Sequence, residues 1–189
     1  MANIVQYGVR PLVGAANMHQ VRRFYCDGTN NSTALFLGDV VKAHSNGGVI
    51  ASSAGAALNN VGVIVGIYDT NGVPVGHPLS VVSTKYLTAS VVGYVDVDLG
   101  LPGALFFIQS ATVVIAATDI FGSAPLVATA GSTTTGRSNH RLGTVTTGVS
   151  DFLILGVVDN GVNAVGSVNC DVIVQFNASI FGQGAGLGI

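Results

Sequence analysis

The sequence predicts an all-β protein, built as an antiparallel β-sandwich, jelly roll or barrel, and three observations lead to this fold class. The 189 residues include 30 Val, 11 Ile and 14 Thr, which favour strands, but no Glu and few Lys, Met or Gln, which favour helices. Short apolar runs recur between turn residues along the chain. All nine acidic residues are Asp and 26 residues are Gly, a usage typical of turns and strand ends.

Nine apolar or alternating segments are expected to form strands. They are residues 21–26, 34–41, 61–68, 91–98, 104–109, 112–117, 142–146, 152–158 and 169–177. In the last segment Cys170, Val172, Val174 and Phe176 share one face, and in 91–98 Tyr94, Asp96 and Asp98 oppose Val95, Val97 and Leu99. This alternation predicts sheets with one face on a core.

Two turn motifs support consecutive antiparallel strands. Asp-Thr-Asn-Gly at 69–72 follows one strand segment, and Asp-Asn-Gly at 159–161 follows another. Residues 51–58 contain enough Ala for a helical turn or two, but their Gly and Ser weaken that interpretation.

The chain reads as one β domain, residues 21–180, between two extended ends. Residues 1–20 are expected to form an N-terminal arm, and the Gly-rich residues 181–189 a flexible C-terminal tail. Residues 27–33 and 128–140 carry the composition of irregular loops. Arm and tail are candidates for contacts between subunits.

The scarcity of charge predicts that the protein is part of an assembly. Charged residues number 16 of 189, and the mean hydropathy is +0.59. Soluble monomers cover themselves with charged side chains and rarely expose large apolar patches. A neighbouring protein surface is therefore expected to cover part of this one.

Charge distribution gives the candidate partner contacts. Residues 1–25 carry +3 from Arg10, Arg22 and Arg23, whereas the remainder carries −5. This pattern fits a basic arm that docks on an acidic neighbour, or chance in a chain with few charges. Arg137 and Arg141 can hold an anion or pair with a neighbouring subunit. The net charge of −2 argues against a nucleic-acid partner.

Other function classes find little support. Residues 43–68 lack charge, but polar residues interrupt them, so no membrane span is expected. Cys26 and Cys170 are expected to be free buried thiols, and no zinc, nucleotide or hydrolase motif is present. Asp96 and Asp98 can bind calcium or act as a catalytic pair, but an exposed strand face kept soluble by two acids is the simpler reading. No signal peptide is recognised, and we expect no enzyme activity, cofactor or small-molecule substrate.

Several segments together resemble capsid decoration, or cement, proteins of tailed bacteriophages. They are GDVVK at 38–42, GGVI at 47–50, VGIYD at 65–69, VDVD at 95–98 leading through Pro102 to LFFIQ at 105–109, and TGRS at 135–138 followed by Leu142. The likeness covers most of residues 38–177. It implies a β-rich module, often a trimer, made in the host cytoplasm and bound to the major capsid protein on the exterior of the virion.

Two alternatives remain open from the sequence. A receptor- or carbohydrate-binding module of the virion is compatible with a β-sandwich, although the chain has no Trp and its five Tyr lie mostly in or beside strands. A hydrolase would depend on Asp96 and Asp98.

Overall fold

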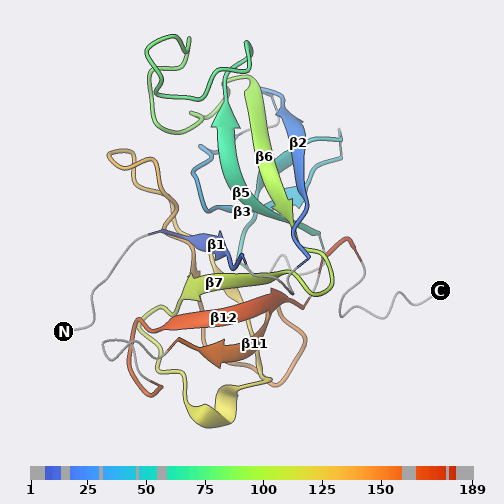
Figure 1. Ribbon diagram of the computed structural model, residues 1–189, viewed down its shortest axis with the longest axis vertical. Helices are drawn as coiled ribbons and strands as arrows, with labels where there is room; N and C mark the ends of the chain where they lie inside the picture. Colours follow the sequence, from blue (N-terminus) through green and yellow to red (C-terminus); the bar gives the residue numbers. More distant parts are fainter. Residues whose placement is uncertain are drawn as a thin grey trace.

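Two five-stranded antiparallel sheets and one two-stranded ribbon form the protein (Figure 1). The computed structural model describes residues 7–13, 18–29, 32–45, 47–54, 59–158, 165–177 and 179–181. Within these residues it contains no α-helix, and no helix there is long and apolar enough to cross a membrane. The prediction of an all-β, antiparallel fold is confirmed.

The β7 sheet has the strand order β1-β7-β12-β11-β8, and the β6 sheet the order β2-β6-β5-β3-β4. The first comprises β1 (Val9–Pro11), β7 (Leu105–Gln109), β12 (Asp171–Phe176), β11 (Phe152–Val157) and β8 (Ser123–Ala124). The second comprises β2 (Val21–Cys26), β6 (Gly93–Leu99), β5 (Asn60–Tyr68), β3 (Val40–Ala43) and β4 (Val49–Ala51). A ribbon of β9 (Leu126–Val127) and β10 (Arg141–Leu142) and the 3-10 helix η1 (Ala117–Asp119) complete the fold.

Strand β5 contributes to two hydrophobic cores. Its residue Ile64 belongs to the core of the β6 sheet, whereas the preceding Val63 belongs to the core of the β7 sheet. Successive side chains of a strand point to opposite faces, so both faces of β5 are buried at this point. Leu101 packs against both cores and joins them. In Figure 1, β5 and β6 run along the molecule while β7, β12 and β11 run across it.

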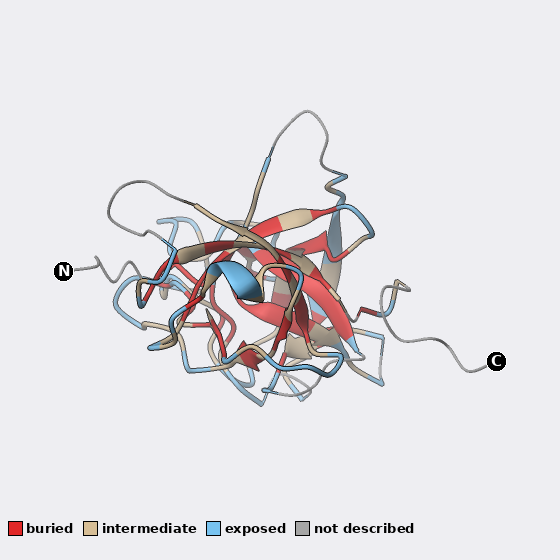
Figure 2. Ribbon diagram, turned by 90° about the horizontal axis from the view of Figure 1, so that it is seen from below, coloured by how far each residue is buried: buried red, intermediate tan, exposed pale blue. Residues whose placement is uncertain are grey.

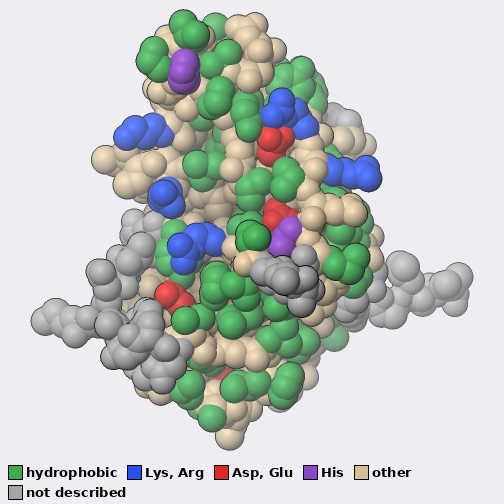
Figure 3. Space-filling model, viewed as in Figure 1, with side chains coloured by type: hydrophobic (Ala, Val, Ile, Leu, Met, Phe, Trp, Pro, Cys, Tyr) green, Lys and Arg blue, Asp and Glu red, His purple; other side chains and the backbone are tan. Residues whose placement is uncertain are grey.

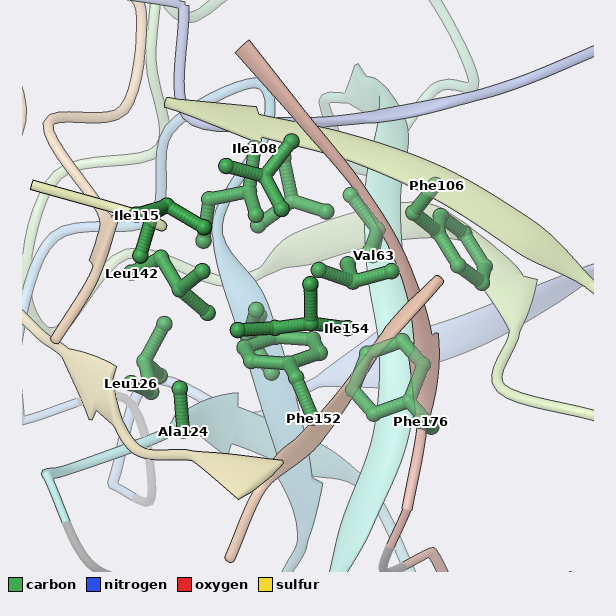
Figure 4. Close-up of a cluster of buried hydrophobic side chains, with 14 of the residues drawn as sticks. Val63, Phe106, Ile108, Ile115, Ala124, Leu126, Leu142, Phe152, Ile154 and Phe176 are labelled. Carbon is green, nitrogen blue, oxygen red and sulfur yellow. The ribbon is translucent and has the colours of Figure 1, made fainter. Parts of the chain in front are cut away.

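Three aromatic rings dominate the core of the β7 sheet. Phe106, Phe152 and Phe176 are at most 1% exposed, and the ring centroid of Phe176 lies 5.2 Å from that of Phe106 and 5.0 Å from that of Phe152. Figure 4 shows Val63 of β5 among these rings and Ile154. Figure 2 shows that most buried segments belong to the strands of the two sheets, whereas η1 is largely exposed.

A buried polar chain links the two sheets. The Ser52 hydroxyl donates to Asn60 Oδ1 at 2.7 Å, and Asn60 Nδ2 donates to Asp151 Oδ1 at 2.8 Å. The second carboxylate oxygen of Asp151 accepts the Leu126 N–H at 2.8 Å. Asn60 and Asp151 are fully buried. Ser52, Asn60 and Asp151 therefore each have a hydrogen-bond partner that offsets the cost of their desolvation.

Six predicted strands are confirmed, those that became β2, β5, β6, β7, β11 and β12. The predictions over 34–41 and 112–117 are wrong for most of their length. The Asp39 carboxylate accepts the Phe36 N–H, and the Asp119 carboxylate accepts the Ala116 N–H. Such local bonds compete with strand pairing. In 142–146, pairing with β9 ends where Gly143 bonds to the Pro125 carbonyl.

The turn and terminal predictions had mixed outcomes. The turn at 69–72 forms, with the Gly72 N–H bonded to the Asp69 carbonyl, but a longer loop then leads to β6. Part of the predicted arm is strand β1, which pairs with β7. Residues 128–140 contain no named element, as predicted. The motif at 159–161 and the tail from residue 182 lie outside the described residues. Of the segment 51–58, where a helical turn was expected, residues 55–58 also lie outside them, and residues 51–54 are not helical.

Both cysteines are free and buried, as predicted. Burial raises the pKa of Cys26 to about 12, so this thiol stays protonated and unreactive at neutral pH.

Candidate interaction surface

A row of three tyrosines crosses the β6 sheet, on a face that the other elements cover only in part. Tyr25 of β2 pairs with Tyr94 of β6, which pairs with Tyr68 of β5. Directly paired residues of antiparallel strands point to the same face. The three side chains, here called the tyrosine row, therefore stand together, with the rings of Tyr25 and Tyr94 5.5 Å apart.

Next to the tyrosine row, an arginine and an aspartate form a bidentate ion pair. Arg23 Nε lies 2.7 Å from Asp96 Oδ1, and its Nη2 lies 3.0 Å from Oδ2. The guanidinium also lies over the Tyr68 ring, 4.1 Å from its centroid. Hydrogen bonding to Arg23 lowers the pKa of Asp96 below its usual value, so the carboxylate is ionised at neutral pH. The bidentate pair and the Tyr68 ring together hold the Arg23 guanidinium in one orientation.

Gly66 makes room for this arrangement. In its place a Cβ atom would lie 2.9 Å from the Tyr68 ring, so a side chain here would displace the tyrosine. A register shift between Ile64 and Gly66 marks a bulge in β5 at the same point. The bulge and the glycine together let the Tyr68 ring lie back toward Arg23.

The exposed part of this face is apolar and aromatic. Tyr25 is 50% exposed, and Val21 and Val65 are also exposed. At the other end of the face Val63 is covered by the β7 sheet. Figure 3 shows this side of the molecule, where hydrophobic side chains lie between separated basic groups. Tyr25 and Arg23 are exposed, whereas Tyr68 and Tyr94 are half-buried, so the β2 end of the tyrosine row is the part open to a partner.

The five arginines predicted as partner contacts have different surroundings. Arg10 is exposed on β1 with its guanidinium 3.8 Å from the centroid of the Tyr7 ring. Arg22 and Arg137 are exposed, and neither has an ion-pair partner among the residues described. Arg23 belongs to the surface above, while Arg141 is half-buried and donates to Asn169 Oδ1 at 3.2 Å.

Asp96 and Asp98 do not act as a pair. Asp96 is bound to Arg23, whereas Asp98 Oδ2 lies 2.7 Å from His19 Nδ1. Asp98 is 2% exposed, so the expectation of an exposed acidic strand face is wrong for this residue. His19, which precedes β2, lies beside Asp98, and its Nε2 also bonds to the Leu12 carbonyl at 3.0 Å. Within the described ranges, no three potential metal ligands cluster.

A cavity of about 500 Å³ lies away from the tyrosine row, between residues 33–39, 51–54 and 128–133. The buried Asp39 and His140 form part of its wall. His140 Nδ1 accepts the Val40 N–H at 3.0 Å, which leaves the ring proton on Nε2, 3.5 Å from Asp39 Oδ1. This pair fastens the 128–140 loop to β3.

Acidification below the ordinary histidine range should weaken the protein through His140. Burial lowers the pKa of His140 below 6.5, so the unfolded chain binds this proton more readily than the folded protein. The free energy of unfolding therefore falls as the pH drops below about 6.5. Burial raises the pKa of Asp39, which works in the opposite direction at lower pH. The contribution of His140 is therefore measured by comparing how much unfolding free energy the wild type and a His140 variant lose on acidification.

Urea titrations between about pH 7 and about pH 5 measure this contribution. The wild type should lose more stability over this range than His140→Gln, which has no ring to protonate. His77→Gln is the control, because His77 is exposed, and it should retain the wild-type decline. Equal declines in wild type and His140→Gln would contradict the assignment.

Only part of this surface can be predicted from the sequence. Alternation places Tyr94 and Asp96 on one face of their segment, but the pairing that brings Tyr25 and Tyr68 beside Tyr94 depends on register, which the sequence does not state. No protein-family model matches the chain, and no curated protein matches it.

Proposed function

We propose that this chain is a structural virion protein that binds and stabilises a bacteriophage capsid shell as an oligomeric decoration, or cement, protein. The partly exposed tyrosine row beside Arg23 is the observation that carries the proposal. Tyr and Arg are the residues most enriched at the energetic centres of protein interfaces, because both bury large area and keep a polar group for hydrogen bonding. The major capsid protein is the proposed occupant of this surface.

The remaining surface supports an assembled state. Large hydrophobic side chains are exposed at several other places, among them Val13, Leu79 and Val81, each more than 60% exposed. Contacts between copies, as in a homotrimer, would remove such groups from water at about 25 cal/mol for each Å² buried. The proposed location is the exterior of the shell, after synthesis in the host cytoplasm.

Replacing Tyr25 with Ala should weaken shell binding strongly. Tyr25 is the most exposed member of the tyrosine row, and truncation of an interface anchor typically costs 2 kcal/mol or more, roughly a 30-fold loss of affinity. The measurement is cosedimentation of the purified chain with shells assembled from the major capsid protein of the same phage.

The matched control is Phe121→Ala, which removes an exposed aromatic ring outside the tyrosine row. It should bind shells within about twofold of the wild type. Circular dichroism verifies that both variants are folded. Wild-type protein that fails to sediment with shells would refute the proposed function, and equal binding by Tyr25→Ala would refute the surface.

The tyrosine row also favours a second candidate, a receptor- or carbohydrate-binding virion module. Sugar rings stack on exposed aromatic faces, and planar pairs such as Arg23 and Asp96 offer donors and acceptors to hydroxyl groups. Strand register, rather than the sequence pattern, brings the three tyrosines onto one face. A glycan array separates the two functions. A specific glycan signal that is lost in Tyr25→Ala, together with a wild-type protein that does not bind shells, would favour this candidate.

A further inference from the structure

The accessible charge of this protein is basic, although its net charge is −2. The described residues include all seven basic side chains and eight of the nine acidic ones. Five of the basic side chains are exposed, whereas none of these eight acidic side chains is. A partner that approaches the described surface therefore meets mainly positive charge.

The acidic side chains are engaged within the fold. Asp39, Asp69 and Asp151 are buried and accept hydrogen bonds from backbone N–H groups. The others bond to Thr29 N–H (Asp27), Arg23 (Asp96), His19 (Asp98), Ala116 N–H (Asp119) and the Tyr7 hydroxyl (Asp171). A carboxylate held by several donors projects a weaker field than a free one.

The basic side chains, in contrast, point outward. Arg22, Lys85 and Arg137 are exposed and have no ion-pair partner among the residues described. Lys85 and Arg137 come from neighbouring backbone, because a Cβ atom at Gly136 would lie 2.4 Å from the Lys85 carbonyl oxygen. Figure 3 shows basic groups spread over the side of the molecule that carries β2 and β6.

We infer that the partner of the tyrosine row presents an acidic protein surface, whose carboxylates face Lys85 and Arg137. Arg22 is left out, because it alternates with Arg23 along β2 and points to the opposite face. The inference rests on the proposed function and names the chemistry of its partner. Complementary charge at the rim of an interface steers association and selects the partner. A nucleic acid fits less well, because the basic groups form no continuous track along which successive phosphates could bind.

Binding to poly-L-glutamate tests the inference without shells. The wild-type chain should bind this polymer, and its affinity should fall about tenfold or more as NaCl rises from about 50 to about 500 mM. The double variant Lys85→Gln and Arg137→Gln should bind about fivefold more weakly at low salt.

The matched control carries the same net charge as this variant but keeps the basic groups. Thr118→Asp and Thr147→Asp add two negative charges at exposed positions near η1, and should leave binding within about twofold of the wild type. An equal loss in both variants, salt-insensitive binding, or tighter binding to oligothymidine than to polyglutamate would overturn the inference.

Shell binding separates this inference from the proposed function. If wild-type protein binds shells but not polyglutamate, the proposed function stands and the acidic partner is refuted. If it binds polyglutamate but no shell, the charge inference stands for another acidic protein and the proposed function is refuted.

Discussion

Phe176→Ala should lower the free energy of unfolding by about 3–5 kcal/mol, the loss typical of a buried Phe truncated to Ala. Phe176 is 1% exposed and packs against the rings of Phe106 and Phe152. A Cβ atom at Gly100 would lie 2.8 Å from the Phe176 ring, so this ring also closes the core where the chain leaves β6. Its loss opens a cavity that the surrounding strands cannot fill.

Equilibrium unfolding in urea measures this loss, and Phe121→Ala is the control. Phe121 is 76% exposed, so removal of its ring should change stability by less than about 1 kcal/mol. A cost below about 1 kcal/mol for Phe176→Ala would show that the three rings do not form the core described here.

Asp151→Ala should cost about 2–5 kcal/mol, because it leaves the Asn60 amide and the Leu126 N–H buried without an acceptor. Each orphaned donor carries the desolvation penalty that the carboxylate had offset. The midpoint of urea denaturation should fall, with little change in its slope.

A graded pair of variants tests this interpretation. Asp151→Asn keeps one acceptor and should lose less stability than Asp151→Ala. Asp119→Ala removes a half-buried carboxylate with a single backbone partner, the Ala116 N–H, and should cost about 1 kcal/mol. Equal losses at positions 119 and 151 would indicate that the link between the sheets adds nothing.

Alternation made the central strands predictable. In β12, Val172, Val174 and Phe176 point to one core, and the even spacing of these residues was visible in the sequence. The same holds for Val95 and Val97 of β6. Short strands such as β8 and β9, each two residues long, carry no such pattern. Their pairing depends on neighbours distant in sequence.

The candidate surface was harder to predict for two physical reasons. Tyr25, Tyr68 and Tyr94 become neighbours through strand register, which arises from packing across the whole β6 sheet. The charge that a partner meets at the surface depends on which carboxylates are hydrogen-bonded within the fold. Counting residues gave an acidic body, yet Asp69 alone accepts the N–H groups of Asn71, Val73 and Val81.

Strand β5 has a mechanical consequence for the proposed decoration function. A pull on Tyr68 acts on the same strand that anchors Val63 beneath the second sheet and Ile64 within the first. Tension applied at the outer face is thereby distributed over both halves of the molecule. Antiparallel ladders resist such tension through many hydrogen bonds at once when it runs along the strand, so a protein built on this shared strand is suited to bear load.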